Sequence, residues 1–298
     1  MPTGMLLARA LLSLAALVLA LDLIWPGAAA RADDIFQSRP TVAQLLALRE
    51  AHGGALDGYP WSAIGRFERP IAGGCTGVLI GRRVVLTAAH CLFDSFAWKW
   101  LPAQALVFTP GVGTPSCCAR VGVRDYRIAP GFSPYLHPAL ITEGVDLALV
   151  LLAGPAGDTA GFLPWLRSTA IEPALARPGS VLLEAGYAEA SAANLSVHGF
   201  CRVMQYFERR HVFVHSCVSL KGESGSPVFA RIGGQYSVAG IEVGTAGVRT
   251  NGRERWGAAA TLQALDRMLA DPAGLAPLSN LDVWGDPRKR IPPPLARR

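Results

Sequence analysis

Three polar residues occur in local contexts that favour a reactive side chain. Ser224 lies between Gly222 and Gly225 in the segment Lys-Gly-Glu-Ser-Gly-Ser-Pro, residues 221–227. A serine hydroxyl becomes a strong nucleophile only when a base takes its proton and hydrogen-bond donors stabilise the resulting oxyanion. Glycines let the backbone bend tightly, so the N–H groups of Gly222 and Ser224 could point at one oxyanion. Taken alone, the segment could equally be an ordinary Gly/Ser turn.

A candidate base and a candidate acid also stand at the ends of apolar runs. His90 follows the apolar segment 84–89 and precedes Cys91. Histidine is the natural general base because its pKa lies near neutrality. Asp146 opens the apolar run 147–152. A buried carboxylate needs a partner, and it could orient the His90 imidazole; a water-exposed aspartate at a strand entry is the alternative. Other histidines lack such a context and are predicted to be structural: His52, His137, His198 and His211.

The elements that must position these residues are predicted to be strands. Short apolar, β-branched runs recur between turn residues, at 62–67, 76–88, 105–108, 120–128, 146–152, 180–185, 200–205, 211–218, 227–230 and 236–243. Many short strands with frequent turn signals are typical of an all-β sandwich or a pair of barrels. The Pro/Gly-rich segment 153–178 could link two halves. Residues 258–270 have helical spacing, with one apolar face formed by Leu262, Leu265, Met268 and Leu269.

The first 32 residues have the pattern of a signal peptide. A short segment ending at Arg9 precedes an apolar run over 10–25, and Ala30-Arg31-Ala32 fits a signal peptidase site. The run contains Asp22 and is shorter than the roughly 20 apolar residues of a membrane-spanning helix. We therefore expect cleavage after Ala32 and a protein that is secreted or periplasmic.

The two remaining terminal segments look separate from the strand-rich region. Residues 33–58 contain one helix-like stretch at 42–49 and are interpreted as a pro-segment or N-terminal arm. Residues 272–298 form a Pro/Arg-rich tail, which we expect to be a solvated terminus rather than a contact to an anionic surface.

Composition excludes several classes of protein. The chain has 298 residues, of which 51% are hydrophobic, so it can bury a sizeable core and is not disordered throughout. Its net charge of +6 is scattered, which argues against nucleic-acid binding. We expect a monomer that does not bind nucleic acid.

The six cysteines are predicted to serve mainly as disulfides, because export places them in an oxidising compartment. Cys75 and Cys91 are 16 residues apart, and so are Cys201 and Cys217. The sequence contains no C-x2-C pair of the kind that binds zinc. A bridge between the adjacent Cys117 and Cys118 would be strained, so the state of these two stays open.

Together, the three reactive segments resemble the chymotrypsin-like serine proteases, in particular the bacterial trypsin-like and glutamyl-endopeptidase-like branch. The resemblance covers residues 59–262. Residues 87–91 match the family's histidine motif at every position, 146–149 its aspartate motif, and 75–80 the strand whose cysteine pairs with the one after the histidine. The order His, Asp, Ser also fits, whereas α/β-hydrolases run Ser, Asp, His and need a glycine where Ser226 stands.

The resemblance implies a fold and a division of roles. The fold is all-β, with two six-stranded antiparallel Greek-key barrels at 59–152 and 179–271 and a C-terminal helix in the second. Between them would lie a catalytic triad of His90, Asp146 and Ser224, which would act on a protein or peptide without a metal ion or other cofactor. The amides of Gly222 and Ser224 would bind the oxyanion, and a Cys201–Cys217 disulfide would tie the strands beneath the substrate pocket.

Glu223 departs from the family pattern. Animal members have an aspartate there, which pairs with the new N-terminal amine after activation cleavage. No Arg-Ile-Val-Gly-Gly activation site precedes Cys75 at a suitable distance. We therefore expect Glu223 to pair with an internal arginine. The alternative is a secreted binding protein that keeps the scaffold without catalysis.

The predicted substrate pocket also differs from that of known relatives. Val218 stands where trypsins carry an acid, and Ser219 follows it. The pocket wall should include Glu242 and Gly244, and glutamyl endopeptidases carry a histidine at the position of Glu242. If Glu242 faces the pocket, it favours a basic residue before the scissile bond (P1). If the strand register shifts by one, Glu242 points away and Val218 sets an apolar preference.

Overall fold

The computed structural model describes residues 59–113, 119–135, 144–177, 180–232, 235–246, 256–271 and Trp284. The predicted signal peptide, the N-terminal arm, most of the C-terminal tail and the pair Cys117–Cys118 lie outside the described residues. Within the described ranges, no helix is both long enough and apolar enough to cross a bilayer.

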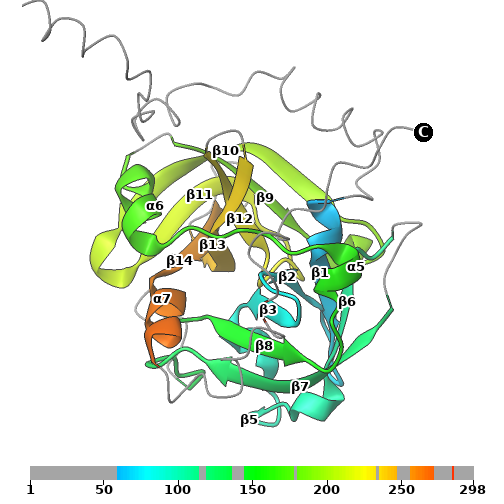
Figure 1. Cartoon of the computed structure of the whole chain (residues 1–298). Helices are drawn as coiled ribbons and strands as arrows, with labels where there is room; N and C mark the ends of the chain where they lie inside the picture. Colours follow the sequence, from blue (N-terminus) through cyan, green and yellow to red (C-terminus); the bar gives the residue numbers. More distant parts are fainter. Residues whose placement is uncertain are drawn as a thin grey trace, which may run out of the picture. The chain divides into compact units, whose positions relative to one another are not determined.

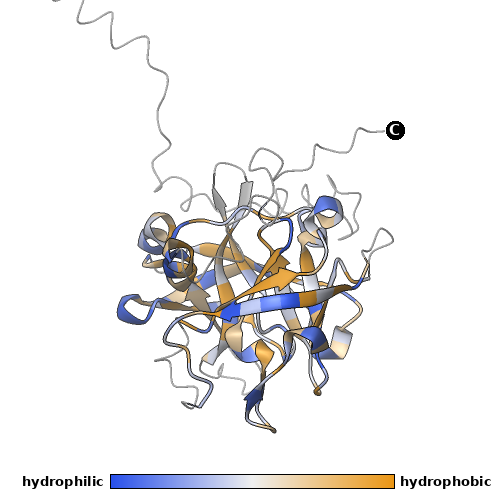
Figure 2. Ribbon diagram, turned by 60° about the horizontal axis from the view of Figure 1, so that its bottom comes forward, coloured by the Kyte–Doolittle hydropathy of each residue, from blue (hydrophilic) through white to orange (hydrophobic). Residues whose placement is uncertain are grey.

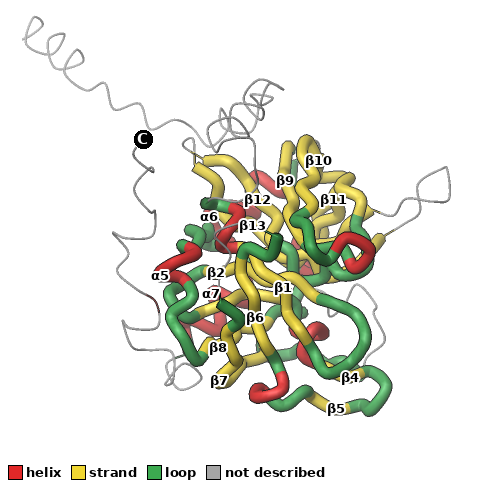
Figure 3. The backbone as a smooth tube through the Cα atoms, turned by 90° about the vertical axis from the view of Figure 1, so that its right-hand side faces the viewer, coloured by secondary structure: helices red, strands yellow, loops and turns green. Residues whose placement is uncertain are grey.

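The first half of the described chain forms a closed antiparallel barrel with the strand order β1-β2-β3-β8-β7-β6 (Figures 1 and 3). Pairing of β1 with β6 closes it. A short hairpin of β4 and β5 extends from this barrel. The strands are β1 (Ile64–Glu68), β2 (Cys75–Leu79), β3 (Val84–Thr87), β4 (Phe93–Asp94), β5 (Lys99–Trp100), β6 (Val107–Pro110), β7 (Val121–Ile128) and β8 (Ala148–Leu152).

The second half forms another closed antiparallel barrel, with the order β10-β11-β14-β13-β12-β9. Its strands are β9 (Val181–Gly186), β10 (Ser196–Phe207), β11 (Val212–Val218), β12 (Pro227–Ile232), β13 (Gln235–Ala246) and β14 (Trp256–Thr261). Two six-stranded antiparallel barrels confirm the predicted fold class.

Short helices connect and close the barrels. The α-helices are α5 (Gly157–Ala160), α6 (Ser168–Leu175) and α7 (Gln263–Ala270). The 3₁₀ helices are η1 (Trp61–Ala63), η2 (Ala89–Leu92), η3 (Ala103–Ala105), η4 (Glu189–Ser191) and η5 (Glu208–Arg210).

Three element predictions need correction. The run 76–88 contains a turn and divides into β2 and β3, with the amide of Ile80 bonded to the carbonyl of Val84 at 3.0 Å. The segment 153–178 is not a plain linker, because it contains α5 and α6. The helix predicted over 258–270 begins only at Gln263. Its first residues form β14 instead, because pairing with β11 and β13 closes the barrel and overrides the helix preference of three alanines.

Buried hydrophobic residues of both barrels form the core, and Figure 2 shows hydrophobic stretches in orange along the strands. Every residue of β2, β3 and β8 is buried. The rings of Phe67 and Phe108 pack at 5.0 Å between centroids inside the first barrel. The barrels also contact each other, with the Trp61 ring edge-on to Phe229 at 6.5 Å. This packing holds the two halves of the site in a fixed relation.

Gly65 in β1 gives a test of this packing. A Cβ there would lie 2.6 Å from the carbonyl oxygen of Thr109 and 2.7 Å from Cα of Pro110, both backbone atoms that cannot move aside. We expect Gly65→Ala to destabilise the protein by about 1–3 kcal/mol. Gly122 in β7 of the same barrel has nothing within 4 Å of its Cβ position, so Gly122→Ala should change stability by less than about 1 kcal/mol. Denaturant unfolding of the two variants checks this, and equal midpoints would contradict it.

Candidate active site

His90 and Asp146 are brought together by the pairing of β3 with β8. Thr87 at the end of β3 lies opposite Ala148 at the start of β8. His90 follows in η2, and Asp146 precedes β8 by two residues. Nδ1 of His90 lies 2.7 Å from Oδ2 of Asp146, and the His90 amide donates to Oδ1 at 2.9 Å. One carboxylate therefore fixes both the imidazole ring and its backbone.

The surroundings of this pair favour a charged imidazole. Burial lowers the pKa of His90, but the charge of Asp146 and its hydrogen bond raise it by more, so the net pKa lies above the ordinary value. The Asp146 side chain is 8% exposed and that of His90 is 35% exposed. The carboxylate is thus shielded from water while the ring remains accessible, as a base acting on a bound molecule must be.

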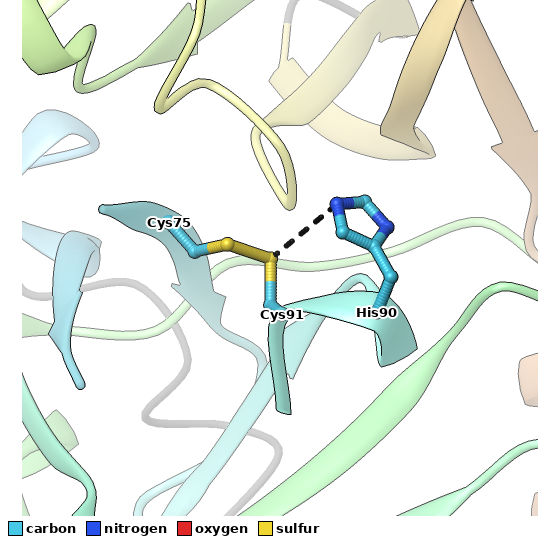
Figure 4. Close-up of side chains that lie close together, drawn as sticks. All are labelled: Cys75, His90 and Cys91. Carbon is cyan, nitrogen blue, oxygen red and sulfur yellow. Dashed lines mark hydrogen bonds between the residues drawn. A yellow bond between two sulfur atoms is a disulfide. The ribbon is translucent and has the colours of Figure 1, made fainter. Parts of the chain in front are cut away.

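The predicted disulfide between Cys75 and Cys91 forms next to His90 (Figure 4). Sγ of Cys91 lies 3.9 Å from Nε2 of His90 and 3.6 Å from the carbonyl oxygen of Ser224. The two sulfurs are bonded to each other, so they are not thiolate ligands for a metal ion. The Cys91 sulfur is therefore close to both His90 and Ser224.

The loop carrying Ser224 is held from both barrels. The amide of Thr76 in β2 donates to the carbonyl of Ser224 at 2.8 Å, and the Thr76 hydroxyl donates to the carbonyl of Gly222 at 3.2 Å. From the second barrel, the carbonyl of Glu242 accepts the amide of Gly225 at 2.8 Å. Gly222 has φ +100°, and a Cβ there would meet the carbonyl of Tyr187 at 2.7 Å, so this position requires glycine.

Glu223 pairs with a histidine, so the prediction that its partner is an internal arginine is wrong. Its carboxylate is fully buried, and Oε1 lies 2.9 Å from Nε2 of His198 on β10. Oε2 accepts the amide of Leu220 at 2.8 Å. The hydrogen bond to Glu223 is the main cause that raises the pKa of His198. Sequence reasoning missed His198 because no local motif marks it; the one available signal was the need of Glu223 for a partner.

The four predicted pocket residues do not share one environment. Val218, Ser219 and Gly244 are partly exposed, whereas Glu242 is 1% exposed. The carboxylate of Glu242 lies 2.8 Å from Nε2 of His215 and accepts the amide of Ala258 at 3.3 Å. The β13–β14 register shifts between Glu242 and Gly244, a bulge that neither of the two simple register alternatives included.

Glu242 belongs to a buried polar cluster inside the second barrel. His215 is fully buried, and burial lowers its pKa, so its neutral ring donates to Glu242. Glu184 on β9 is also fully buried, and burial followed by the charge of Glu242 raises its pKa well above the ordinary value. Burial therefore favours the neutral form of Glu184, while Glu242 is the carboxylate that has hydrogen-bond partners in His215 and the Ala258 amide. The predicted Cys201–Cys217 disulfide forms as well, which removes the adjacent Cys217 sulfur as a metal ligand.

Comparisons with known proteins agree with this architecture. The chain is 25% identical to the glutamyl endopeptidase of Bacillus licheniformis over 216 residues, which are 70% of this chain and 63% of that protein. It is 37% identical to coagulation factor XII of Bos taurus over 129 residues, 42% of this chain and 18% of that one. The chain thus spans less than two thirds of the length of both curated relatives.

A solved structure of a Glu endopeptidase superposes on this chain with a TM-score of 0.54. The superposition covers 73% of this chain and 94% of the other at 16% sequence identity, so it shows a similar fold. The sequence model of the trypsin-like peptidase domain matches residues 75–241. That match begins in the first barrel, ends in the second and spans more than half of the chain, so this protein belongs to the trypsin-like peptidase family.

Proposed function

We propose that the protein is an exported serine endopeptidase that hydrolyses peptide bonds through an acyl-enzyme. The observation that carries this proposal is that Asp146 accepts hydrogen bonds from both the ring and the backbone amide of His90, beside a serine loop held by Thr76. Membership of the trypsin-like peptidases supports the same activity. Two disulfides support an oxidising compartment outside the cytoplasm.

In the proposed reaction, Ser224 Oγ attacks the scissile carbonyl while Nε2 of His90 takes its proton. Asp146 holds the ring and stabilises the imidazolium, which suits the raised pKa of His90. The amides of Gly222 and Ser224 donate to the oxyanion. His90 then protonates the leaving amine, and a water molecule activated by His90 hydrolyses the ester to release Ser224.

The pairing of Glu223 with His198 replaces the pairing with a new N-terminus. A buried carboxylate next to the nucleophile must be compensated, or the loop rearranges to expose it. His198 and the Leu220 amide supply that compensation from within the chain. We infer that the loop reaches its active shape without an activation cleavage.

For the substrate pocket, we propose that Val218, Ser219 and Gly244 contact the P1 side chain and that Glu242 supplies charge at its inner end. The buried Glu242 carboxylate accepts hydrogen bonds from His215 and the Ala258 amide, and its charge helps to raise the pKa of His90. A buried negative charge repels an acidic P1 residue and favours a cationic one. The expected preference is therefore for Arg or Lys, unlike the relatives named as glutamyl endopeptidases.

The activity is tested by intact mass of the exported protein after treatment with a fluorophosphonate. We expect one adduct, because Ser224 is activated by His90, and no adduct on Ser224→Ala. An unlabelled wild-type protein, with or without residues 33–58, would contradict the proposal and favour a binding protein on a protease scaffold.

The role of His198 is tested by His198→Ala, which leaves Glu223 buried with one partner fewer. We expect a loss of about 2–3 kcal/mol in stability and an at least tenfold slower fluorophosphonate reaction. Because the pKa of His198 is raised from 6.5, its contribution is full below pH 6.5 and declines as the pH rises through the raised value. His198→Gln, which keeps a donor, should recover much of the rate. His211→Ala removes a similar pair, with Glu172, and should not slow labelling.

The P1 preference is tested with fluorogenic peptides that differ only in having Arg, Leu or Glu at P1. We expect kcat/KM to be highest for Arg, and Glu242→Gln to lower it at least tenfold for Arg with little change for Leu. Gln keeps an acceptor for His215, and equal fluorophosphonate labelling shows that the variant is folded. A best rate with Glu at P1, or an unchanged Arg rate in the variant, would overturn the assignment.

A further inference from the structure

A groove lies beside the catalytic residues on the first barrel. It has a volume of about 330 Å³ and is lined by the end of β1 and the following turn, including Arg66, Arg69, Gly73 and Gly74, and by Glu189 of η4. The predicted substrate pocket, in contrast, is built from the second-barrel residues Val218, Ser219 and Gly244. The groove is thus a separate surface.

Both walls of this groove are hydrogen-bonded to chain neighbours of the proposed catalytic residues. Gly74 precedes Cys75, and Nη1 of Arg69 donates to the carbonyl of Cys91 at 3.1 Å, so this wall is attached to the disulfide next to His90. On the other wall, the amide of Glu189 donates to the carbonyl of Lys221, next to Gly222. The groove therefore borders both the base and the oxyanion-binding loop.

The orientation of the His90 ring indicates which half of the substrate lies near the groove. Nε2 of His90 must protonate the departing amine, and this nitrogen faces the Cys75–Cys91 disulfide at 3.9 Å (Figure 4). The leaving half of the peptide therefore emerges beside the disulfide. At about 3.3 Å per extended residue, the first few residues after the scissile bond would reach the adjoining groove.

The guanidinium groups of Arg66 and Arg69 line the groove. A Cβ on Gly74 would lie 3.1 Å from Nε of Arg66, and a Cβ on Gly73 would lie 3.1 Å from Nη2 of Arg69. These two glycines leave space for the arginine heads. The hydrogen bonds of Arg69 all go to backbone carbonyls. Within the residues that the structure describes, Arg66 has no acidic partner.

The acids that line the groove have their own cationic partners. Glu68 binds Arg120 through both carboxylate oxygens. Glu189 pairs with Lys221 at 2.9 Å. Burial lowers the pKa of Arg69, and the charges of Glu189 and Asp94 only partly offset this. The lining itself has two arginines and two glutamates, but each glutamate also pairs with a cation outside the lining, Arg120 or Lys221. Among the described residues, no carboxylate is hydrogen-bonded to Arg66 or Arg69.

We infer that this groove is a carboxylate-binding subsite for the leaving half of the substrate, with Arg66 and Arg69 as its specificity-determining residues. The inference rests on the proposed peptidase function. A planar guanidinium binds a carboxylate through two parallel hydrogen bonds, and two such groups over a glycine turn match an Asp or Glu side chain. The same chemistry would accept the terminal carboxylate of a short peptide.

The test uses internally quenched peptides that share all residues before the scissile bond. Each carries Asp, Asn or Lys at one of the three positions after it, with a free or an amidated C-terminus. We expect kcat/KM to be about tenfold higher for Asp than for Asn at one position, and lowest for Lys. The preference should shrink in about 1 M salt, since the groove is open to solvent. If kcat/KM rises only for peptides with a free C-terminus, the terminal carboxylate is the ligand of the same subsite.

Arg66→Gln should reduce the Asp-over-Asn ratio three- to tenfold, mainly by slowing cleavage of the Asp peptide. Arg66→Glu should reverse the preference toward Lys. The matched control is Arg124→Gln, which removes an exposed arginine of β7 in the same barrel and should leave the ratio unchanged. A fluorophosphonate-reactive enzyme with no acidic preference, or one whose preference survives Arg66→Glu, would overturn the subsite. Loss of fluorophosphonate labelling in the wild type would instead refute the peptidase function.

Discussion

The geometry of the site depends on Thr76, a fully buried residue at which the two barrels are bonded to each other. Its amide and hydroxyl donate to the carbonyls of Ser224 and Gly222, and its hydroxyl accepts the amide of Tyr187 at 2.9 Å. The neighbouring Cys75 is bonded to Cys91, which follows His90. Two consecutive residues of β2 therefore fix the serine loop and the histidine segment. Since buried hydrogen bonds are costly to leave unmade, separating the barrels would disrupt this region first.

Two glutamates near the serine loop are compensated by histidines, and the two pairs respond to burial in opposite ways. The pKa of His198 is raised, because its side chain is 24% exposed and the hydrogen bond to Glu223 outweighs desolvation. The pKa of His215 is lowered, because that ring is completely buried and desolvation dominates. The His198 pair therefore tends toward an ion pair that fixes the loop, whereas the His215 ring tends toward its neutral form beside Glu242.

Features encoded by consecutive residues could be predicted from the sequence, and features decided by distant contacts could not. The two barrels follow from short apolar runs, and the closeness of His90 to Asp146 from motifs at strand ends. The helix over 258–270 was misplaced because alanines prefer helices locally, while barrel closure decides their structure. His198 and Glu223 pair although they are 25 residues apart in the sequence, and no local sequence pattern indicates such a pairing. The direction of Glu242 depends on a bulge in β13 that periodicity does not reveal.

The charges proposed to select a substrate also act on the base. Asp146 and Glu242 raise the pKa of His90, and Arg69 lowers it. A carboxylate bound in the groove would neutralise part of the Arg69 charge and so raise the pKa of His90 further. A higher pKa stabilises the imidazolium formed when Ser224 loses its proton, which is also the species that protonates the leaving amine. A substrate with an acidic residue after the scissile bond would thereby gain in both binding and proton transfer, because the charge of Arg69 would act on both the substrate and His90.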